Sequence, residues 1–232
     1  MNFSGRHVIV TGGTGALGTA LVGALIRAGA HCHVPFIETR VSPHFEHAQS
    51  TSVTLHAQVD LSDDVQVTRL YAALPSLWAS IHLAGGFAAS KIADTSKTDL
   101  MQMIDMNLVS AFLCSREAVK IMTRGGSGRV VNVAARPALE PRSGAGMTAY
   151  TVSKAGVAAL TAALAEEVVR QDILVNAVAP SVMDTAANRA AMPKADHAKW
   201  PKVEEVAATI LFLASPDNRV TRGSVVQVYG KS

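Results

Sequence analysis

Short apolar runs alternate along the chain with longer stretches of helical periodicity. The apolar runs predict seven strands, at residues 7–10, 31–37, 53–59, 78–83, 129–134, 173–178 and 224–228. The stretches with helical spacing are residues 16–28, 63–74, 97–122, 149–170 and 203–214. Within 97–122 we expect the helix to be interrupted near Asn107.

Most of these strands are continuous apolar runs, which is typical of a parallel sheet covered on both faces. Strands and helices alternate throughout, as they do in α/β proteins. We therefore predict a doubly wound, Rossmann-type α/β fold with a seven-stranded, mainly parallel sheet and helices on both faces. The chain has no fixed-period repeat and no break in composition, so we expect a single domain over residues 1–232. Residues 181–202 are expected to be long and irregular, and within them residues 184–200 form a loop of the kind that covers a substrate.

Composition excludes several classes of protein. Hydrophobic residues make up 49% of the chain and charged residues 17%, which indicates a globular protein. The net charge is +3, but Lys and Arg are scattered and aromatic residues are only 5%, so we expect no nucleic-acid partner. No signal peptide and no apolar run of about 18 residues is visible, so we expect a cytoplasmic protein without a membrane partner.

Cysteine and histidine positions do not suggest a metal site. Cys32 and Cys114 are the only cysteines, and they have neither a disulfide pattern nor zinc-ligand spacing. His31, Cys32 and His33 are consecutive, but neighbouring residues of a strand point to opposite faces of the sheet. We therefore expect no bound metal.

A glycine-rich segment joins the first strand to the first helix. Gly12, Gly15 and Gly18 lie between residues 7–10 and the helix that follows. Glycine allows the backbone to approach a ligand closely. The helix N-terminus offers free N–H groups and a partial positive charge for a pyrophosphate, and Gly18 would let the helix pack against the strand. We interpret this segment as a dinucleotide-binding loop, the alternative being a tight structural turn.

Tyr150 and Lys154 are four residues apart, so they share one face of the predicted helix 149–170. An ammonium beside a phenol favours the phenolate and lowers the pKa of the tyrosine. A tyrosine tuned in this way can exchange a proton with a carbonyl or alcohol oxygen. We therefore expect Tyr150 and Lys154 to be catalytic, with Lys154 also able to hold a cofactor ribose.

These motifs, in this order, resemble the short-chain dehydrogenase/reductase family over nearly the whole chain. The resemblance implies an NAD(P)-dependent oxidoreductase that assembles as a homodimer or homotetramer through the helices that contain Asn107 and Tyr150. It implies that Asn107 holds a water in a proton relay to Lys154. The cofactor residues that it implies are Gly12, Thr14, Gly15, Leu17, Gly18, Asp60, Leu61, Ala84, Gly85, Lys154, Pro180 and Thr185. Of these, Asp60 and Leu61 would contact the adenine, and Thr185 would contact the nicotinamide carboxamide.

The main departure from the family is Ala135, which stands where the family has a serine that binds the substrate oxygen. The loss indicates either weakened catalysis or a branch that works without the serine. Residues 84–87, residues 134–139 with Gly146-Met147, and residues 184–196 with Trp200 resemble dihydropteridine reductase. That enzyme keeps the Tyr and Lys without the serine and reduces a quinonoid ring. Ser143 or Thr148 could substitute, or both could be loop hydroxyls that face water. A second departure is His82-Leu83, which replaces the usual Asn before Ala84-Gly85.

The cofactor preference depends on the residues after the second strand. Phe36 occupies the position where an acid usually marks NAD, and Glu38 and Arg40 lie just beyond it. Arg40 favours NADP over NAD, although both charges could be solvated.

We therefore expect an enzyme that reduces a carbonyl or quinonoid small molecule with NAD(P)H, and in which Tyr150 donates the proton. One alternative is a 3-oxoacyl-carrier-protein reductase, for which Lys194, Lys199 and Lys202 would meet an acidic carrier protein. Another alternative is a catalytically weak NAD(P)-binding scaffold or sensor, suggested by Ala135.

Overall fold

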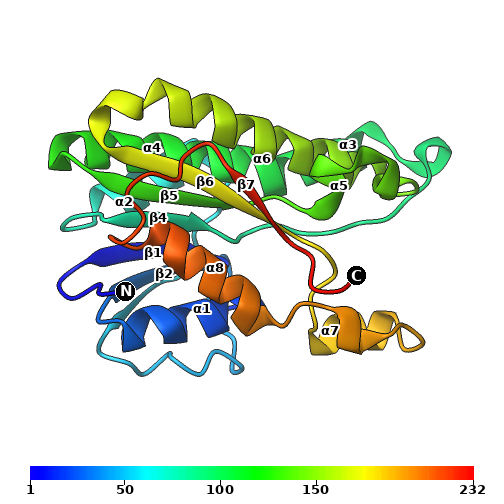
Figure 1. The fold of residues 1–232 in the computed structure, drawn as a ribbon, viewed down its shortest axis with the longest axis horizontal. Helices are drawn as coiled ribbons and strands as arrows, with labels where there is room; N and C mark the ends of the chain where they lie inside the picture. Colours follow the sequence, from blue (N-terminus) through cyan, green and yellow to red (C-terminus); the bar gives the residue numbers. More distant parts are fainter.

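The computed structural model describes all residues, 1–232, and is built around one seven-stranded sheet (Figure 1). The strands follow the order β3-β2-β1-β4-β5-β6-β7, and every neighbouring pair is parallel. Their bounds are β1 His7–Thr11, β2 His31–Pro35, β3 Val53–His56, β4 Ala79–His82, β5 Gly128–Val133, β6 Ile173–Pro180 and β7 Val225–Val228. The predicted doubly wound α/β fold is confirmed, and the sheet is parallel throughout.

Helices cover both faces of this sheet (Figure 1). Helices α1 (Ala16–Arg27) and α8 (Val203–Ala214) pack on one face, and α2 (Asp64–Ala72), α4 (Ser110–Gly125) and α6 (Thr148–Glu167) pack on the other. Because side chains alternate along a strand, Val8 and Val10 of β1 join the core under α1 and α8, while Ile9 joins the core under α2 and α4. None of the helices combines the length and the apolar character needed to cross a bilayer.

The expected interruption near Asn107 is a π-helical turn. Helix α3 (Lys97–Ile104) begins with a capping box in which Ser96 and Asp99 satisfy each other's backbone N–H. Residues Asp105–Val109 then form the π-turn, and α4 continues directly from it. Such turns are rare and often occur at functional sites. Here the π-turn directs Asn107 into the interior, where only 1% of it is exposed.

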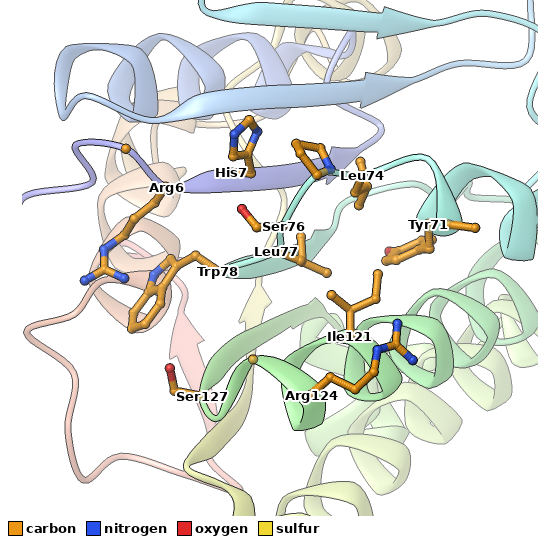
Figure 2. A pocket seen from close by; sticks show the side chains of 14 residues that line it. Arg6, His7, Tyr71, Leu74, Ser76, Leu77, Trp78, Ile121, Arg124 and Ser127 are labelled. Atoms are coloured by element: carbon orange, nitrogen blue, oxygen red, sulfur yellow. The ribbon is translucent and has the colours of Figure 1, made fainter.

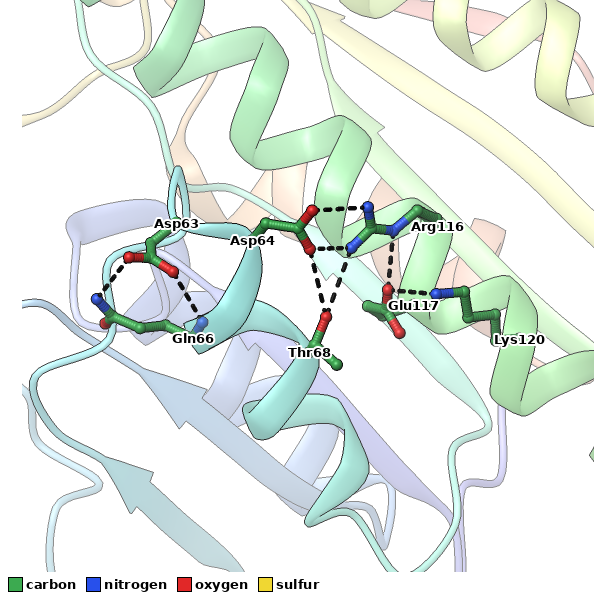
Figure 3. A network of polar contacts seen from close by, with 7 residues as sticks. All are labelled: Asp63, Asp64, Gln66, Thr68, Arg116, Glu117 and Lys120. Carbon is green, nitrogen blue, oxygen red and sulfur yellow. Dashed lines mark hydrogen bonds and ion pairs between the residues drawn. The ribbon is translucent and has the colours of Figure 1, made fainter.

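Helices α2 and α4 are linked by a charged network on their surface (Figure 3). The Arg116 guanidinium donates to Asp64 of α2 and, at 2.8 Å, to Glu117. Lys120 completes the network by pairing with Glu117 at 2.7 Å. Exposed pairs of this kind contribute little stability individually. Glu117 is nevertheless buried, so its two cationic partners neutralise a charge that would otherwise be costly to bury.

The segment 181–202 is more regular than predicted. It contains helix α7 (Ala186–Ala191) and a 3₁₀ turn at His197–Lys199. Asp184 N–H donates to the Pro201 carbonyl at 2.9 Å, and the Asp184 carboxylate pairs with Arg189 at 2.5 Å. The short helices at Arg136–Leu139 and Pro141–Gly144 were also not predicted. Caps and single ion pairs define such short elements, and they span too few residues for hydrophobic periodicity to reveal them.

Candidate active site

The glycine-rich turn packs its backbone directly against the end of β4. Gly12 has φ +65°, and a Cβ added there would lie 2.7 Å from the Ala84 nitrogen. A Cβ on Gly18 would lie 2.3 Å from the Gly12 carbonyl oxygen. The Thr11 hydroxyl accepts a hydrogen bond from Ala84 N–H at 3.2 Å. Glycine is therefore required at position 12 for the turn to pack against the end of β4, and at position 18 for the start of α1 to pack against the turn.

A cavity of about 930 Å³ opens beside this turn at the carboxyl edge of the sheet. Seven of the predicted cofactor residues line it: Gly12, Thr14, Gly15, Asp60, Leu61, Ala84 and Gly85. Helix α1 begins at this cavity, and no side chain caps its first N–H groups. The cavity therefore offers what a dinucleotide needs, namely a helix N-terminus for phosphate and an apolar slot for a base.

The other predicted cofactor residues lie outside this lining. Leu17 is buried in the core under α1, and Gly18 acts through packing. Pro180 ends β6, and the Thr185 hydroxyl accepts a hydrogen bond from Asn188 N–H at 3.2 Å, which caps α7. Beyond β2, Phe36 and Glu38 line the cavity, whereas Arg40 is exposed and is not part of the lining.

Lys154 is buried and points toward the end of β5. Only 6% of it is exposed, and its Nζ donates to the Val133 carbonyl at 2.8 Å. Burial lowers the pKa of Lys154 to about 8, because the ammonium loses its hydration. A Cβ on Gly85 would lie 3.3 Å from this Nζ, so the ammonium lies beside the cavity wall.

Tyr150 lies one helical turn before Lys154. Its ring packs edge-to-face against the Phe87 ring, with the two ring centroids 5.0 Å apart. Burial raises the pKa of Tyr150 to about 12, so the expectation that Lys154 lowers it is wrong for this structure. The reason is geometric, because loss of water around the phenol dominates and the ammonium is directed at the Val133 carbonyl. Tyr150 is therefore protonated at neutral pH, which is the state that a proton donor requires.

Asn107 joins the loop after β4 to helix α6. Its Oδ1 accepts from Gly86 N–H at 3.0 Å, and its Nδ2 donates to the Gly86 carbonyl at 3.1 Å and to Ser153 Oγ at 3.1 Å. Ser153 in turn donates to the Tyr150 carbonyl at 2.7 Å. The sequence analysis missed Ser153, although its position three residues after Tyr150 places it on a neighbouring face of the helix. It also missed the Val133 carbonyl, because a backbone group leaves no sequence signal.

The position of the missing serine is buried and has no hydroxyl. Ala135 is 6% exposed and lies at the N-cap of the short helix Arg136–Leu139. Ser143 donates its hydroxyl to the Glu140 carbonyl at 2.8 Å within an exposed turn, and Thr148 is an exposed residue at the start of α6. The three lysines of the covering segment are also exposed: Lys194, Lys199 and Lys202.

Comparison with known proteins identifies the family. Residues 6–196 match the family model described as short chain dehydrogenase. A short-chain type dehydrogenase/reductase of Picea abies is 33% identical over 188 residues, which are 75% of this chain and 69% of that protein. A 3-oxoacyl-[acyl-carrier-protein] reductase of Rickettsia bellii is 26% identical over 99% of this chain and 98% of its own.

Among solved structures, ElxO with NADP bound superposes with a TM-score of 0.87 and 24% identity, covering 97% of both chains. At this identity the likeness establishes the fold alone. The family match over most of the chain, together with the Picea abies relative, decides the assignment. The protein therefore belongs to the short-chain dehydrogenase/reductase family and is an NAD(P)-dependent oxidoreductase.

Proposed function

We propose that this protein reduces a carbonyl or quinonoid small molecule with NAD(P)H, and that Tyr150 donates the proton. The observation that supports the proposal is a half-buried, protonated phenol on the same helix face as an ammonium that adjoins the cavity wall at Gly85. The glycine turn, Asp60, Leu61 and Ala84 would hold the dinucleotide, which supplies the hydride.

Each residue has a separate task in this proposal. The Tyr150 hydroxyl gives its proton to the substrate atom that gains negative charge. Lys154 has three N–H donors, and Val133 takes one of them, so two remain for the cofactor ribose. Asn107 is a positioning residue, because its amide binds both backbone groups of Gly86 and thereby fixes the loop that borders the cofactor.

Ala135 narrows the proposed substrate class. Without a hydroxyl at position 135, the developing oxyanion of a simple ketone would have one fewer hydrogen-bond donor. In other enzymes one such donor stabilises the transition state by about 3 kcal/mol. A quinonoid ring depends less on this donor because it accepts hydride readily. We therefore favour a quinonoid substrate and place the protein near the serine-free, dihydropteridine-reductase-like branch.

A screen of NAD(P)H oxidation over quinonoid pterins, quinones, diketones and 3-oxoacyl thioesters tests the proposal. Tyr150→Phe should lower kcat on the best substrate by roughly 100-fold or more, the usual contribution of a general acid. Ala135→Ser should raise kcat/KM for simple ketones more than for quinones, because only the ketone gains a needed donor. Turnover that survives Tyr150→Phe would remove the phenol from the proton step, and a lack of turnover on every substrate would favour a cofactor-binding scaffold.

The Rickettsia relative supports a second candidate, the reduction of a carrier-bound 3-oxoacyl thioester. Lys194, Lys199 and Lys202 lie exposed on the covering segment and could meet an acidic carrier protein. Activity on the carrier-bound thioester that falls with salt and with Lys194→Glu, while a free thioester is unaffected, would select this candidate.

The proposed preference for NADP is based on Arg40 and on Phe36, which replaces the acidic residue typical of NAD-binding proteins. Glu38, which lines the cavity, favours NAD instead. Fluorescence titration with NADH and NADPH decides between them. Tenfold tighter binding of NADH would reject the preference for NADP.

A further inference from the structure

Four histidines gather on one face of the sheet at its β3-β2-β1 edge, away from the cofactor cavity. His7 of β1 is paired in register with His31 of β2, and His33 lies two residues further along β2 on the same face. His56 of β3 is in register with Pro35, so it also lies on this face. Cys32 points to the opposite face, where it is buried in the core under α1.

The rings are close enough to share an ion. The centroids of His7, His31 and His33 are 5.1–5.2 Å apart in all three pairs. One ring nitrogen of each lies within 4.8 Å of the other two, and Nδ1 of His7 lies only 2.9 Å from Nε2 of His33. Ligand nitrogens on a tetrahedral zinc ion are about 3.3 Å apart, so small side-chain rotations would bring the three nitrogens to that spacing.

We propose that His7, His31 and His33 bind one divalent transition-metal ion of the Zn²⁺ class. Imidazole nitrogen is a preferred ligand of these ions. Three protein ligands leave a fourth position for water. The site would tie β1 to β2, and it lies outside the proposed catalytic machinery.

The surroundings already orient two of the three ligands. A metal-binding histidine normally donates its second ring N–H to a fixed acceptor. Nδ1 of His33 lies 3.1 Å from Nε2 of His56, and Nε2 of His31 lies 2.8 Å from Thr54 Oγ1. With these N–H groups directed at His56 and Thr54, the remaining nitrogens of His33 and His31 present lone pairs to the ion.

One of the three ligands also borders a cavity. His7 is among the residues that line a cavity of about 510 Å³ at the amino end of the sheet, and Figure 2 labels its side chain there. An ion would reach the cluster from this side through His7.

This proposal departs from the sequence-based expectation of no metal. For the histidines of β2, the expectation used only the alternation along the strand, which correctly separates Cys32 from its neighbours. The same alternation puts His31 and His33 together, and strand pairing then adds His7 from a position 24 residues earlier in the chain.

The test is direct binding of Zn²⁺ to the purified, tag-free chain by equilibrium dialysis and calorimetry. The wild type should bind one ion per chain and melt at a higher temperature in its presence, since only the folded chain assembles the site. His7→Gln and His31→Gln, both at half-buried positions, should each weaken binding at least tenfold. His44→Gln, on an exposed loop, is the matched control and should bind as the wild type does.

A second measurement does not depend on the variants. Co²⁺ added to the wild type should give the intense visible absorption of a four-coordinate ion, and Zn²⁺ should bleach it. The proposal is overturned if the wild type binds neither ion, if Co²⁺ shows only the weak absorption of an octahedral surface ion, or if the double variant His7→Gln/His31→Gln retains wild-type affinity.

Discussion

The buried ammonium of Lys154 should destabilise the folded protein, and its removal makes that cost measurable. Burial takes the pKa of this group from 10.5 to about 8, which corresponds to roughly 3 kcal/mol at neutral pH. Lys154→Met removes this penalty and also removes the hydrogen bond to the Val133 carbonyl, which is worth about 1 kcal/mol. We therefore expect the variant to be about 2 kcal/mol more stable at pH 7, and to be inactive.

The effect should depend on pH in a defined direction. The folded pKa lies below the unfolded one, so between pH 8 and 10.5 the unfolded chain binds a proton that the folded chain has lost. The wild type therefore gains stability as pH rises through this window, and the advantage of Lys154→Met should shrink by about 2 kcal/mol, and so nearly vanish, by about pH 9.5.

Urea unfolding followed by circular dichroism at the two pH values measures both quantities, with Lys91→Met, at an exposed position, as the control. A Lys154→Met protein that is less stable than wild type at pH 7, or an advantage that is equal at both pH values, would refute the reasoning. A less stable Lys154→Met protein would mean that the contacts of the ammonium contribute more free energy than burial costs it in lost hydration.

Three further perturbations test other parts of the structure. Gly18→Ala places a Cβ 2.3 Å from the Gly12 carbonyl oxygen and should lower the Tm by about 5 °C. Gly15→Ala is the control, because its Cβ would lie 3.5 Å from the nearest atom and should leave the Tm unchanged. Equal Tm values for the two variants in scanning calorimetry would contradict the packing argument. The pKa of buried His82 is lowered to about 4, so between pH 6.5 and 4 only the unfolded chain binds this proton and stability falls with pH. His82→Asn should reduce the loss of unfolding free energy between pH 7 and about pH 5 by about 2 kcal/mol, and an unchanged loss in urea titrations would exclude His82 as its source. Phe112 on α4 is 50% exposed, and if α4 and α6 form a subunit interface, Phe112→Lys should convert an oligomer to a monomer in light scattering, while a monomeric wild type would reject the interface.

Much of the fold was predictable because its signals are local. Short runs of apolar or alternating residues identified all seven strands, and α8 was predicted with its exact ends at residues 203 and 214. The glycine turn was recognisable because a strand, a run of glycines and a helix in this order place a helix N-terminus where it can bind phosphate. Lys154 could be paired with Tyr150 because helical spacing places them on one face.

Only the tertiary structure decided properties that depend on burial and on contacts between distant segments. The pKa of Tyr150 moves upward, against the sequence-based expectation, because loss of water around the phenol outweighs a cation whose hydrogen bond goes to a carbonyl of β5. Glu38 lines the cavity and Arg40 does not, because the chain turns away from the cavity after residue 38. The histidine cluster exists only because parallel pairing aligns three strands. Periodicity and spacing describe a segment and its own neighbours, whereas hydration and cross-strand proximity are set by the whole packed chain.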